Sequence, residues 1–217
     1  MIRREGANDM KGTKLLVVAD DLTGGLDTGV QFAGRGVGVR VVMEADVPAA
    51  LRDGESEVLV AVAETRHLPS SQAHDLVFRL VGAAVQAGVP HIYKKTDSAL
   101  RGNIGAELSA ALAASGAKAL PFLPAFPRMD RITVGGRHYI GGVPVSESAF
   151  ARDPFNPVRE SDVCRLIAAQ TDVPVRHAAP EAVSPDSGIC VVDAASDDDL
   201  RAAGRRLAAL EIGIAHV

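Results

Sequence analysis

The stretch YKKTDSALRGNIG, residues 93–105, joins an apolar run to a helical pattern through a turn rich in charge. The apolar run occupies residues 89–93, and Ile104, Leu108 and Leu112 recur beyond the turn at helical spacing. A strand that passes through a polar turn into a helix is the repeating unit of α/β folds. Open sheets of this kind bind ligands at the carboxyl ends of their strands, so the turn is a candidate binding site.

The turn carries three cations and a carboxylate within eight residues: Lys94, Lys95, Arg101 and Asp97. This set could hold an anion and position a hydroxyl group. A second interpretation stays open, in which the turn is a solvated loop and Asn103 caps the following helix. If the strand continues through both lysines, their side chains point to opposite sides and only one of them reaches a ligand.

Short apolar runs recur along the chain and alternate with helical patterns. They occupy residues 14–19, 39–43, 58–62, 118–123 and 189–192, and residues 213–217 resemble the start of another strand. This alternation predicts an α/β fold with a mainly parallel sheet and helices on both faces, a Rossmann-like three-layer arrangement. The pair Gly135-Gly136 separates two short β-like segments and predicts an inserted β-hairpin.

Polar residues follow several of the predicted strands at the point where each strand ends. They include the pair Asp20-Asp21, then Arg66, Asp97 and Asp193. Because the carboxyl ends of parallel strands meet at one edge of a sheet, these groups would line a shared crevice of mixed charge. Cations there suit a carboxylate or phosphate, and carboxylates suit hydroxyl groups. The alternative is that each acid only caps the helix after it.

Composition excludes several classes of protein. The 217 residues carry a net charge of −4 and no Lys/Arg cluster, so nucleic-acid binding has no support. No apolar run approaches 18 residues, so the sequence predicts no membrane span. Residues 1–13 form an N-terminal extension without the apolar core of a signal peptide, which favours a cytoplasmic protein.

Six blocks of the sequence resemble the signature blocks of the four-carbon acid sugar kinases, in that family's order. They are ADDLTG (19–24), KKTDSALRGN (94–103), PAFP (124–127), VGGRHY (134–139), DPFNPV (153–158) and VDAASD (192–197). Together they cover about residues 15–200. The family includes D-threonate, D-erythronate and 3-oxo-tetronate kinases.

The resemblance implies ATP-dependent phosphorylation of a terminal hydroxyl on a four-carbon sugar acid. Members of the family have an N-terminal sugar-acid domain and a C-terminal nucleotide domain. Residues 14–212 are similar to the first, and the nucleotide-binding domain is expected to be absent from this chain. ATP and Mg²⁺ are therefore expected for the full enzyme. The expected protein partners are further copies of the chain in a homo-oligomer or a separate nucleotide-binding half. No cofactor or metal residue is assignable here, because GRGVG (34–38) has the wrong spacing and context for a phosphate loop.

Phosphoryl transfer needs a positioned hydroxyl, neutralisation of charge and a carboxylate to take the proton. The catalytic candidates are Asp20, Asp21 and Asp97. The candidates for substrate binding are Arg66, Lys95, Ser98 and Arg101, with Arg101 and Lys95 clamping the carboxylate and Ser98 donating to it. For Arg66 a surface salt bridge is an equal alternative. His138 is expected to pack or hydrogen-bond within the hairpin rather than to catalyse.

The chain departs from the family pattern at Asp130 and Ile132, where relatives usually have Gly and Thr. The first change affects a backbone turn, and the second removes a hydroxyl group. One alternative function is a truncated or split protein that binds a sugar acid without catalysis. A second is an aspartyl phosphatase, but that chemistry needs Asp-x-Asp, whereas Asp20 and Asp21 are adjacent and point apart.

Overall fold

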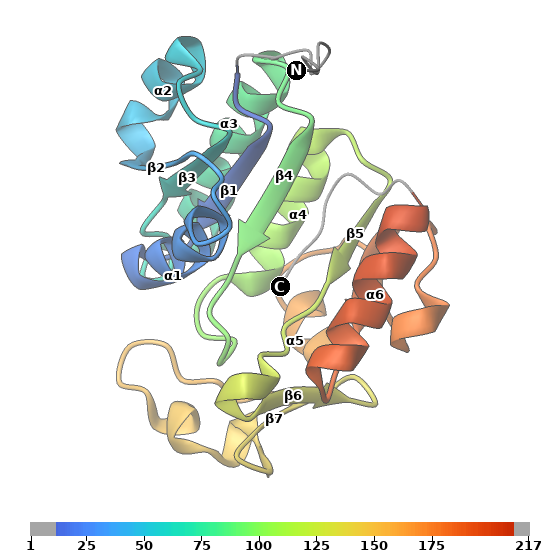
Figure 1. Ribbon diagram of the computed structural model, residues 1–217. Helices are drawn as coiled ribbons and strands as arrows, with labels where there is room; N and C mark the ends of the chain where they lie inside the picture. The colour runs from blue at the N-terminus through green and yellow to red at the C-terminus, as the bar shows by residue number, and fades with distance from the viewer. Residues whose placement is uncertain (1–11, 211–217) are drawn as a thin grey trace.

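A computed structural model describes residues 12–210 of the chain. Its larger sheet contains four parallel strands in the order β2-β3-β1-β4, drawn in blue to green in Figure 1. The strands are β1 (Leu15–Ala19), β2 (Val39–Met43), β3 (Val58–Val62) and β4 (His91–Lys95). This sheet confirms the predicted α/β fold class.

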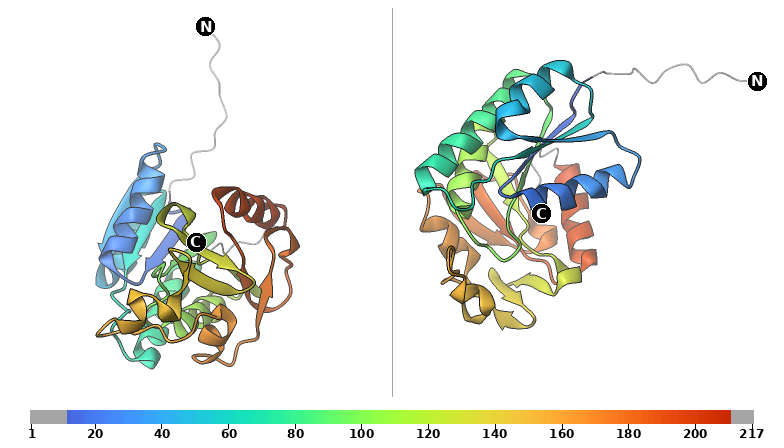
Figure 2. Two further views of the ribbon diagram at one scale, coloured as in Figure 1. Left: turned by 90° about the horizontal axis from the view of Figure 1, so that it is seen from below. Right: turned by 90° about the vertical axis from the view of Figure 1, so that its left-hand side faces the viewer.

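The strands of this sheet are short apolar runs because helices cover both of its faces. One face is covered by α1 (Leu22–Ala33), where Val17 and Val60 meet partly buried Phe32. The other face is covered by α2 (Val47–Asp53) and α3 (Ser70–Gln86), which pack on the alternate strand residues Leu16, Val18, Leu59 and Ala61. Figure 2 shows helices on the two sides of the sheet, as the sequence predicted.

The remaining parallel strands form a second sheet, a division that the sequence analysis did not predict. This sheet has the order β5-β10-β9, with β5 (Ala119–Phe122), β9 (Val175–Ala178) and β10 (Gly188–Val192). Helix α6 (Asp197–Ala209) packs on one face, where Leu207 meets Cys190 and Val192. The short helix α5 (Val163–Ala168) lies near its other face. Strand β9 had no counterpart in the sequence analysis.

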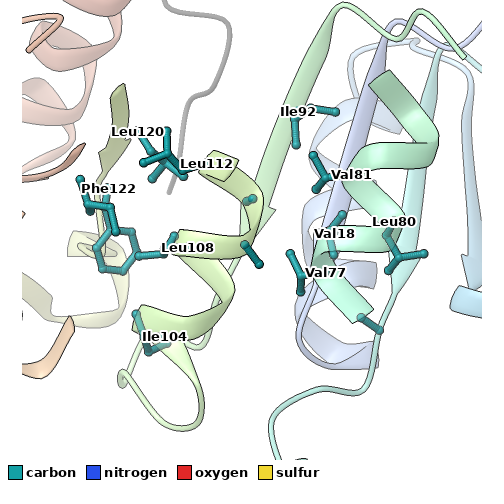
Figure 3. Close-up of a cluster of buried hydrophobic side chains, with 14 of the residues drawn as sticks. Val18, Val77, Leu80, Val81, Ile92, Ile104, Leu108, Leu112, Leu120 and Phe122 are labelled. Atoms are coloured by element: carbon teal, nitrogen blue, oxygen red, sulfur yellow. The ribbon is translucent and has the colours of Figure 1, made fainter. Parts of the chain in front are cut away.

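Helix α4 (Ile104–Ser115) joins the two sheets through one continuous core. It is apolar on nearly all sides, and residues 104–112 are buried throughout. Figure 3 shows Leu108 and Leu112 directed toward Leu120 and Phe122 of β5, with α3 and the larger sheet on the other side. A helix that is apolar all round is expected in this central position.

The predicted hairpin is confirmed and extended to three antiparallel strands. They are β6 (Arg131–Val134), β7 (Arg137–Ile140) and β8 (Val143–Pro144). The single-turn helices are η1 (Glu44–Asp46), η2 (Pro127–Met129), η3 (Val145–Glu147), η4 (Ala149–Arg152) and η5 (Pro180–Ala182). The loop after β4 descends toward the hairpin, which lies below both sheets in Figure 1.

Two expectations concern parts of the chain outside the described residues. These are most of the N-terminal extension, residues 1–13, and the strand at 213–217. Within residues 12–210, no helix is both long enough and apolar enough to cross a membrane.

Candidate functional site

Arg66 connects three of the strand ends that the sequence placed at one edge. Its Nε and Nη2 atoms lie 2.9 and 2.8 Å from Oδ2 of Asp20, which follows β1. Its Nη1 lies 2.7 Å from Oδ2 of Asp21, and Nη2 lies 3.8 Å from Oδ1 of Asp97, which follows β4. The predicted convergence of Asp20, Arg66 and Asp97 is therefore observed, and Arg66 is a partly buried residue that contacts all three carboxylates rather than an exposed surface side chain.

Asp20 is the carboxylate with an unused oxygen. The residue is 2% exposed, and its Oδ1 atom has no hydrogen-bond partner in residues 12–210. Burial raises the pKa of Asp20 to about 6, against the opposing charges of Lys94 and Arg66. A buried carboxylate with a free oxygen and a pKa near neutrality can accept a proton from a bound hydroxyl group.

Asp21 and Asp97 are held by other groups. Asp21 caps α1, because its Oδ1 accepts from the Gly24 amide at 2.7 Å while its Oδ2 faces Arg66. Asp97 accepts from Nε and Nη2 of Arg101 at 2.7 and 3.0 Å. Burial acts to raise the pKa of Asp97, but these hydrogen bonds and the charge of Arg66 outweigh it and lower the pKa. The three predicted catalytic carboxylates thus differ in their chemistry.

The two adjacent lysines lie on opposite sides of β4, as predicted for a strand that continues through both. The Lys94 side chain is fully buried, with Nζ 2.5 Å from Oε2 of Glu107 on α4. Lys95 donates to the Thr96 carbonyl at 2.6 Å and lies beside Gly24 at the start of α1. Burial lowers the pKa of Lys95, and Asp20 and Asp97 partly offset this effect.

Ser98 is held by the hairpin at two atoms. Its hydroxyl accepts a hydrogen bond from Nη1 of Arg131, and its carbonyl accepts one from Nε2 of His138 at 2.9 Å. Nδ1 of His138 lies 3.0 Å from the Thr133 hydroxyl, and burial lowers the histidine pKa to about 4. His138 is therefore a neutral structural residue at neutral pH, consistent with the packing role expected of it.

Arg101 lies between the loop and the segment that follows the hairpin. Its Nη1 is 3.2 Å from Asp153, and its guanidinium lies 5.2 Å from the ring centre of Phe150. The Arg131 guanidinium lies 5.4 Å from the same ring centre. Sequence reasoning missed Arg131 and Asp153 as parts of the site. Asp153 did lie in a recognised block, and Arg131 lay between the two noted departures.

Asp193 is not part of this cluster, although the sequence placed it at the same edge. It follows β10 in the second sheet and accepts from the amides of Gly135 and Gly136 at 2.7 and 3.0 Å. Its Oδ2 also lies 2.9 Å from Nε2 of His177. Asp193 therefore holds the hairpin turn against the second sheet.

Asn103 occupies the first cap position of α4, but its side chain does not cap the helix. Its Nδ2 donates to the carbonyls of Thr65 and Leu68 at 3.0 and 2.9 Å, which ties the β3 loop to the β4 loop. Oε1 of Gln170 instead accepts from the Gly105 amide at 2.8 Å. The cap comes from 65 residues away, so local sequence could not show it.

The departure at Asp130 preserves the backbone turn. Asp130 has φ 54° and ψ 37°, a left-handed conformation that glycine adopts most easily and aspartate tolerates. Its amide donates to the Pro127 carbonyl and its carbonyl accepts from the Gly141 amide, both at 2.9 Å. Ile132 pairs with Tyr139 in the hairpin. Arg131, which lies between the two departures, donates to the Ser98 hydroxyl in the loop after β4.

Residues 12–210 contain no group of three or more His, Cys, Asp and Glu side chains arranged for a metal ion. Residues 34–38 lead from the end of α1 into β2, whereas a phosphate loop leads from a strand into a helix. A cavity of about 350 Å³ is lined by Leu100, Gly102 and residues 155–160, but none of the charged cluster lines it.

The comparisons with known sequences agree with one another. A family described as a sugar-binding N-terminal domain matches residues 15–215. The chain is 36% identical over 201 residues to the D-threonate kinase of Salmonella typhimurium, an alignment that covers 86% of this chain and 47% of that kinase. It is 31% identical over 161 residues to the D-erythronate kinase of Heliobacterium modesticaldum, covering 73% and 36% of the two chains. The chain spans about half the length of the D-threonate kinases it matches.

Solved structures show the same fold. A structure from Bordetella bronchiseptica superposes with a TM-score of 0.83 and 33% identity, covering 94% of this chain and 53% of that one. It is described as a domain of unknown function with bound citrate, in a domain-swapped dimer. A protein from Haemophilus influenzae has a TM-score of 0.82 at 22% identity, which shows similarity of fold alone.

Proposed function

Because the chain belongs to the four-carbon acid sugar kinase family, we propose that its Asp20 cluster binds a four-carbon sugar acid and presents one hydroxyl group for phosphorylation. The observation that carries the proposal is the Oδ1 atom of Asp20, which is buried and has no hydrogen-bond partner among the described residues. It lies where the loops after β1, β3 and β4 meet. D-threonate, D-erythronate and 3-oxo-tetronate are the candidate substrates, after the names of the relatives.

We propose a different role for each of the predicted residues, based on its contacts. Asp20 would accept the proton of the reacting hydroxyl, because its pKa of about 6 leaves it ionised yet basic at neutral pH. Arg66 would hold Asp20 in place, because it contacts the Asp20 carboxylate, and Asp21 would in turn fix Arg66 by a second ion pair. Asp97 is the poorer base, because its two oxygens accept from Arg101. The bound citrate of the Bordetella structure, a hydroxylated carboxylate, agrees with this class of ligand.

We assign ATP and Mg²⁺ to a nucleotide-binding half beyond this domain, where Mg-ATP would supply the phosphoryl group. The assignment is supported by residues 34–38, a Gly-rich stretch that leads from a helix into a strand and so does not fit a phosphate loop. We also propose that the reaction takes place in the cytoplasm, because ATP is the expected phosphoryl donor. The domain-swapped dimer described for the Bordetella structure supports a homo-oligomer.

A second candidate is a sugar-acid-binding protein without catalysis. It is favoured by the description of the matching family as a sugar-binding domain. Both candidates share the ligand and differ in turnover.

The test is calorimetric titration of the 217-residue chain with D-threonate, D-erythronate and their epimers, with and without Mg-ATP. We expect saturable binding of one sugar acid that does not depend on ATP. An Asp20→Asn variant should bind at least about tenfold more weakly, because a charged hydrogen bond is lost. A chain that binds none of these acids would contradict the proposal, and sustained heat of ATP turnover would contradict the assignment of ATP to another half.

A further inference from the structure

The site contains two kinds of cation, distinguished by their carboxylate contacts. Arg66 and Arg101 are surrounded by carboxylates: every side-chain nitrogen of each lies within 3.2 Å of Asp20, Asp21, Asp97 or Asp153. These carboxylates already neutralise both guanidinium groups and would repel a ligand carboxylate, although each arginine keeps two N–H donors on its terminal nitrogens. Both arginines are therefore structural residues of the cluster.

Lys95 and Arg131 are the cations without such partners. Among residues 12–210, neither lies within 4 Å of a carboxylate oxygen. Lys95 donates to the Thr96 carbonyl and Arg131 to the Ser98 hydroxyl, which are neutral acceptors. Both side chains are partly buried, and a partly buried cation that forms no ion pair is stabilised by an incoming anion. Asp20 and Asp97 act on the charge of Lys95 only from beyond ion-pair distance.

The two cations contact one short loop. Their acceptors, Thr96 and Ser98, are two residues apart between β4 and α4. Lys95 approaches from the strand end, beside the start of α1, while Arg131 approaches from β6 of the hairpin. The hairpin reaches the loop from below the sheet in Figure 1. The Phe150 ring beneath the Arg131 guanidinium limits its movement and leaves its edge available for hydrogen bonds.

We infer that Arg131 and Lys95 form the carboxylate-binding pair of the site, and that Arg101 and Arg66 position the loop without contacting the ligand carboxylate. This inference rests on the proposed function and refines it. It places the charged end of the sugar acid at the hairpin side of the loop and leaves the hydroxyl end for Asp20. Arg131 is then a specificity residue, because it distinguishes an acid from an uncharged sugar derivative.

The test compares a sugar acid with its neutral amide, D-threonate against D-threonamide, by calorimetry and ligand-observed NMR on the full 217-residue chain. Wild type should prefer the acid at least about tenfold. Arg131→Gln should lower acid affinity about 10- to 100-fold and leave amide affinity nearly unchanged, because a charged hydrogen bond to the carboxylate is lost. Arg101→Gln should weaken both ligands in parallel, because it disturbs the loop that both require.

Arg137→Gln is the matched control, since Arg137 is an exposed arginine of the same hairpin. It should bind both ligands as wild type does. Arg131→Lys keeps the charge without the planar fork and should retain part of the acid preference. Thermal unfolding identifies any variant that does not fold, and Arg131→Lys then replaces Arg131→Gln as the decisive variant.

The outcomes separate this inference from the proposed function. If wild type binds the acid and both Arg131 variants keep its full preference over the amide, the carboxylate assignment is wrong while the proposed function stands. If Arg101→Gln alone abolishes the preference, Arg101 holds the carboxylate. If wild type binds no four-carbon sugar acid, the proposed function fails and this assignment fails with it.

Discussion

At the scale of single residues, Asp20, Asp21 and Asp97 show how neighbours give one side-chain type different properties. Asp21 caps a helix and Asp97 accepts hydrogen bonds from Arg101, whereas Asp20 has one oxygen without a hydrogen-bond partner among the described residues. The sequence could predict that the three carboxylates meet, because parallel strands bring their ends together. The sequence could not show which of the three is the best proton acceptor, because that depends on which nitrogen of Arg66 or Arg101 contacts each oxygen.

The Asp20→Asn substitution should change how the free energy of unfolding depends on pH. Relative to wild type, the variant should be more stable at neutral pH than at low pH. The folded-state pKa of Asp20 is raised from 3.8 to about 6, so the folded protein binds the proton more tightly than the unfolded chain. The stabilisation from protonated Asp20 is therefore present below about pH 4 and is lost as pH rises through 6. Denaturant unfolding should show the variant gaining on the order of 3 kcal/mol relative to wild type between pH 4 and pH 7.

The difference between variant and wild type isolates Asp20 and the groups that interact with it, because the more distant titrating groups contribute equally to both proteins. Buried His138, with its pKa lowered to about 4, loses its contribution as pH falls from 6.5 and acts in the opposite sense. A constant difference between variant and wild type across pH 4–7 would show that the pKa of Asp20 is not raised.

At the scale of elements, α4 depends on contacts that its own sequence does not show. A Cβ atom at Gly105 would lie 2.5 Å from the carbonyl oxygen of Ile167 in α5. The Gly105 amide donates a hydrogen bond to the Gln170 side chain. The start of the helix at Ile104 was visible in its periodicity. Its capping by Gln170 and its close approach to α5 were not, because both depend on residues more than 60 positions away.

Gly105→Ala should destabilise the protein by roughly 2–3 kcal/mol, because the methyl group forces α4 and α5 apart. The matched control is Gly82→Ala in α3, where a Cβ atom meets nothing within 4 Å. That change should be stabilising by about 0.5–1 kcal/mol, since alanine has the higher helix propensity. Thermal unfolding of the two variants measures both effects, and equal destabilisation by the two would contradict the contact.

The Lys94–Glu107 pair joins β4 to α4 through a contact that is almost completely buried. Lys94→Met should cost about 3–5 kcal/mol, because Glu107 is left as an uncompensated buried charge. The double variant Lys94→Met/Glu107→Leu should recover most of this loss, because it removes both charges. Denaturant unfolding of the two single variants and the double variant gives the coupling. Additive losses would mean that the two side chains do not depend on each other.

At the scale of the whole molecule, two sheets share one hydrophobic core. Leu16 and Val18 of the larger sheet belong to the same buried cluster as Leu120 and Ile189 of the smaller one, with Leu108 of α4 between them. The sequence predicted the fold class and nearly every strand, because apolar period and turn residues are local signals. It did not predict the division into two sheets, because strand neighbours are chosen by tertiary packing.

The shared core leads us to expect one cooperative unfolding transition for residues 12–210. Scanning calorimetry should give a calorimetric enthalpy equal to the van't Hoff enthalpy, as for a two-state domain. Two resolved transitions would show that the smaller sheet and the hairpin unfold separately from the larger sheet. Leu108→Ala should lower the midpoint temperature of this transition, because it opens a cavity between the sheets. The transition should remain single.

The alternation of Lys94 and Lys95 also restricts how this chain can vary in length during evolution. A one-residue insertion or deletion within β4 would exchange the two lysines, placing the inner one beside Gly24 and the outer one beside Glu107. Such a shift in register would move both the Lys94–Glu107 ion pair and Lys95, the proposed ligand-binding residue. Length changes should therefore be tolerated in the turn at residues 87–90, before β4 begins to pair with β1, and be absent between that pairing and Thr96.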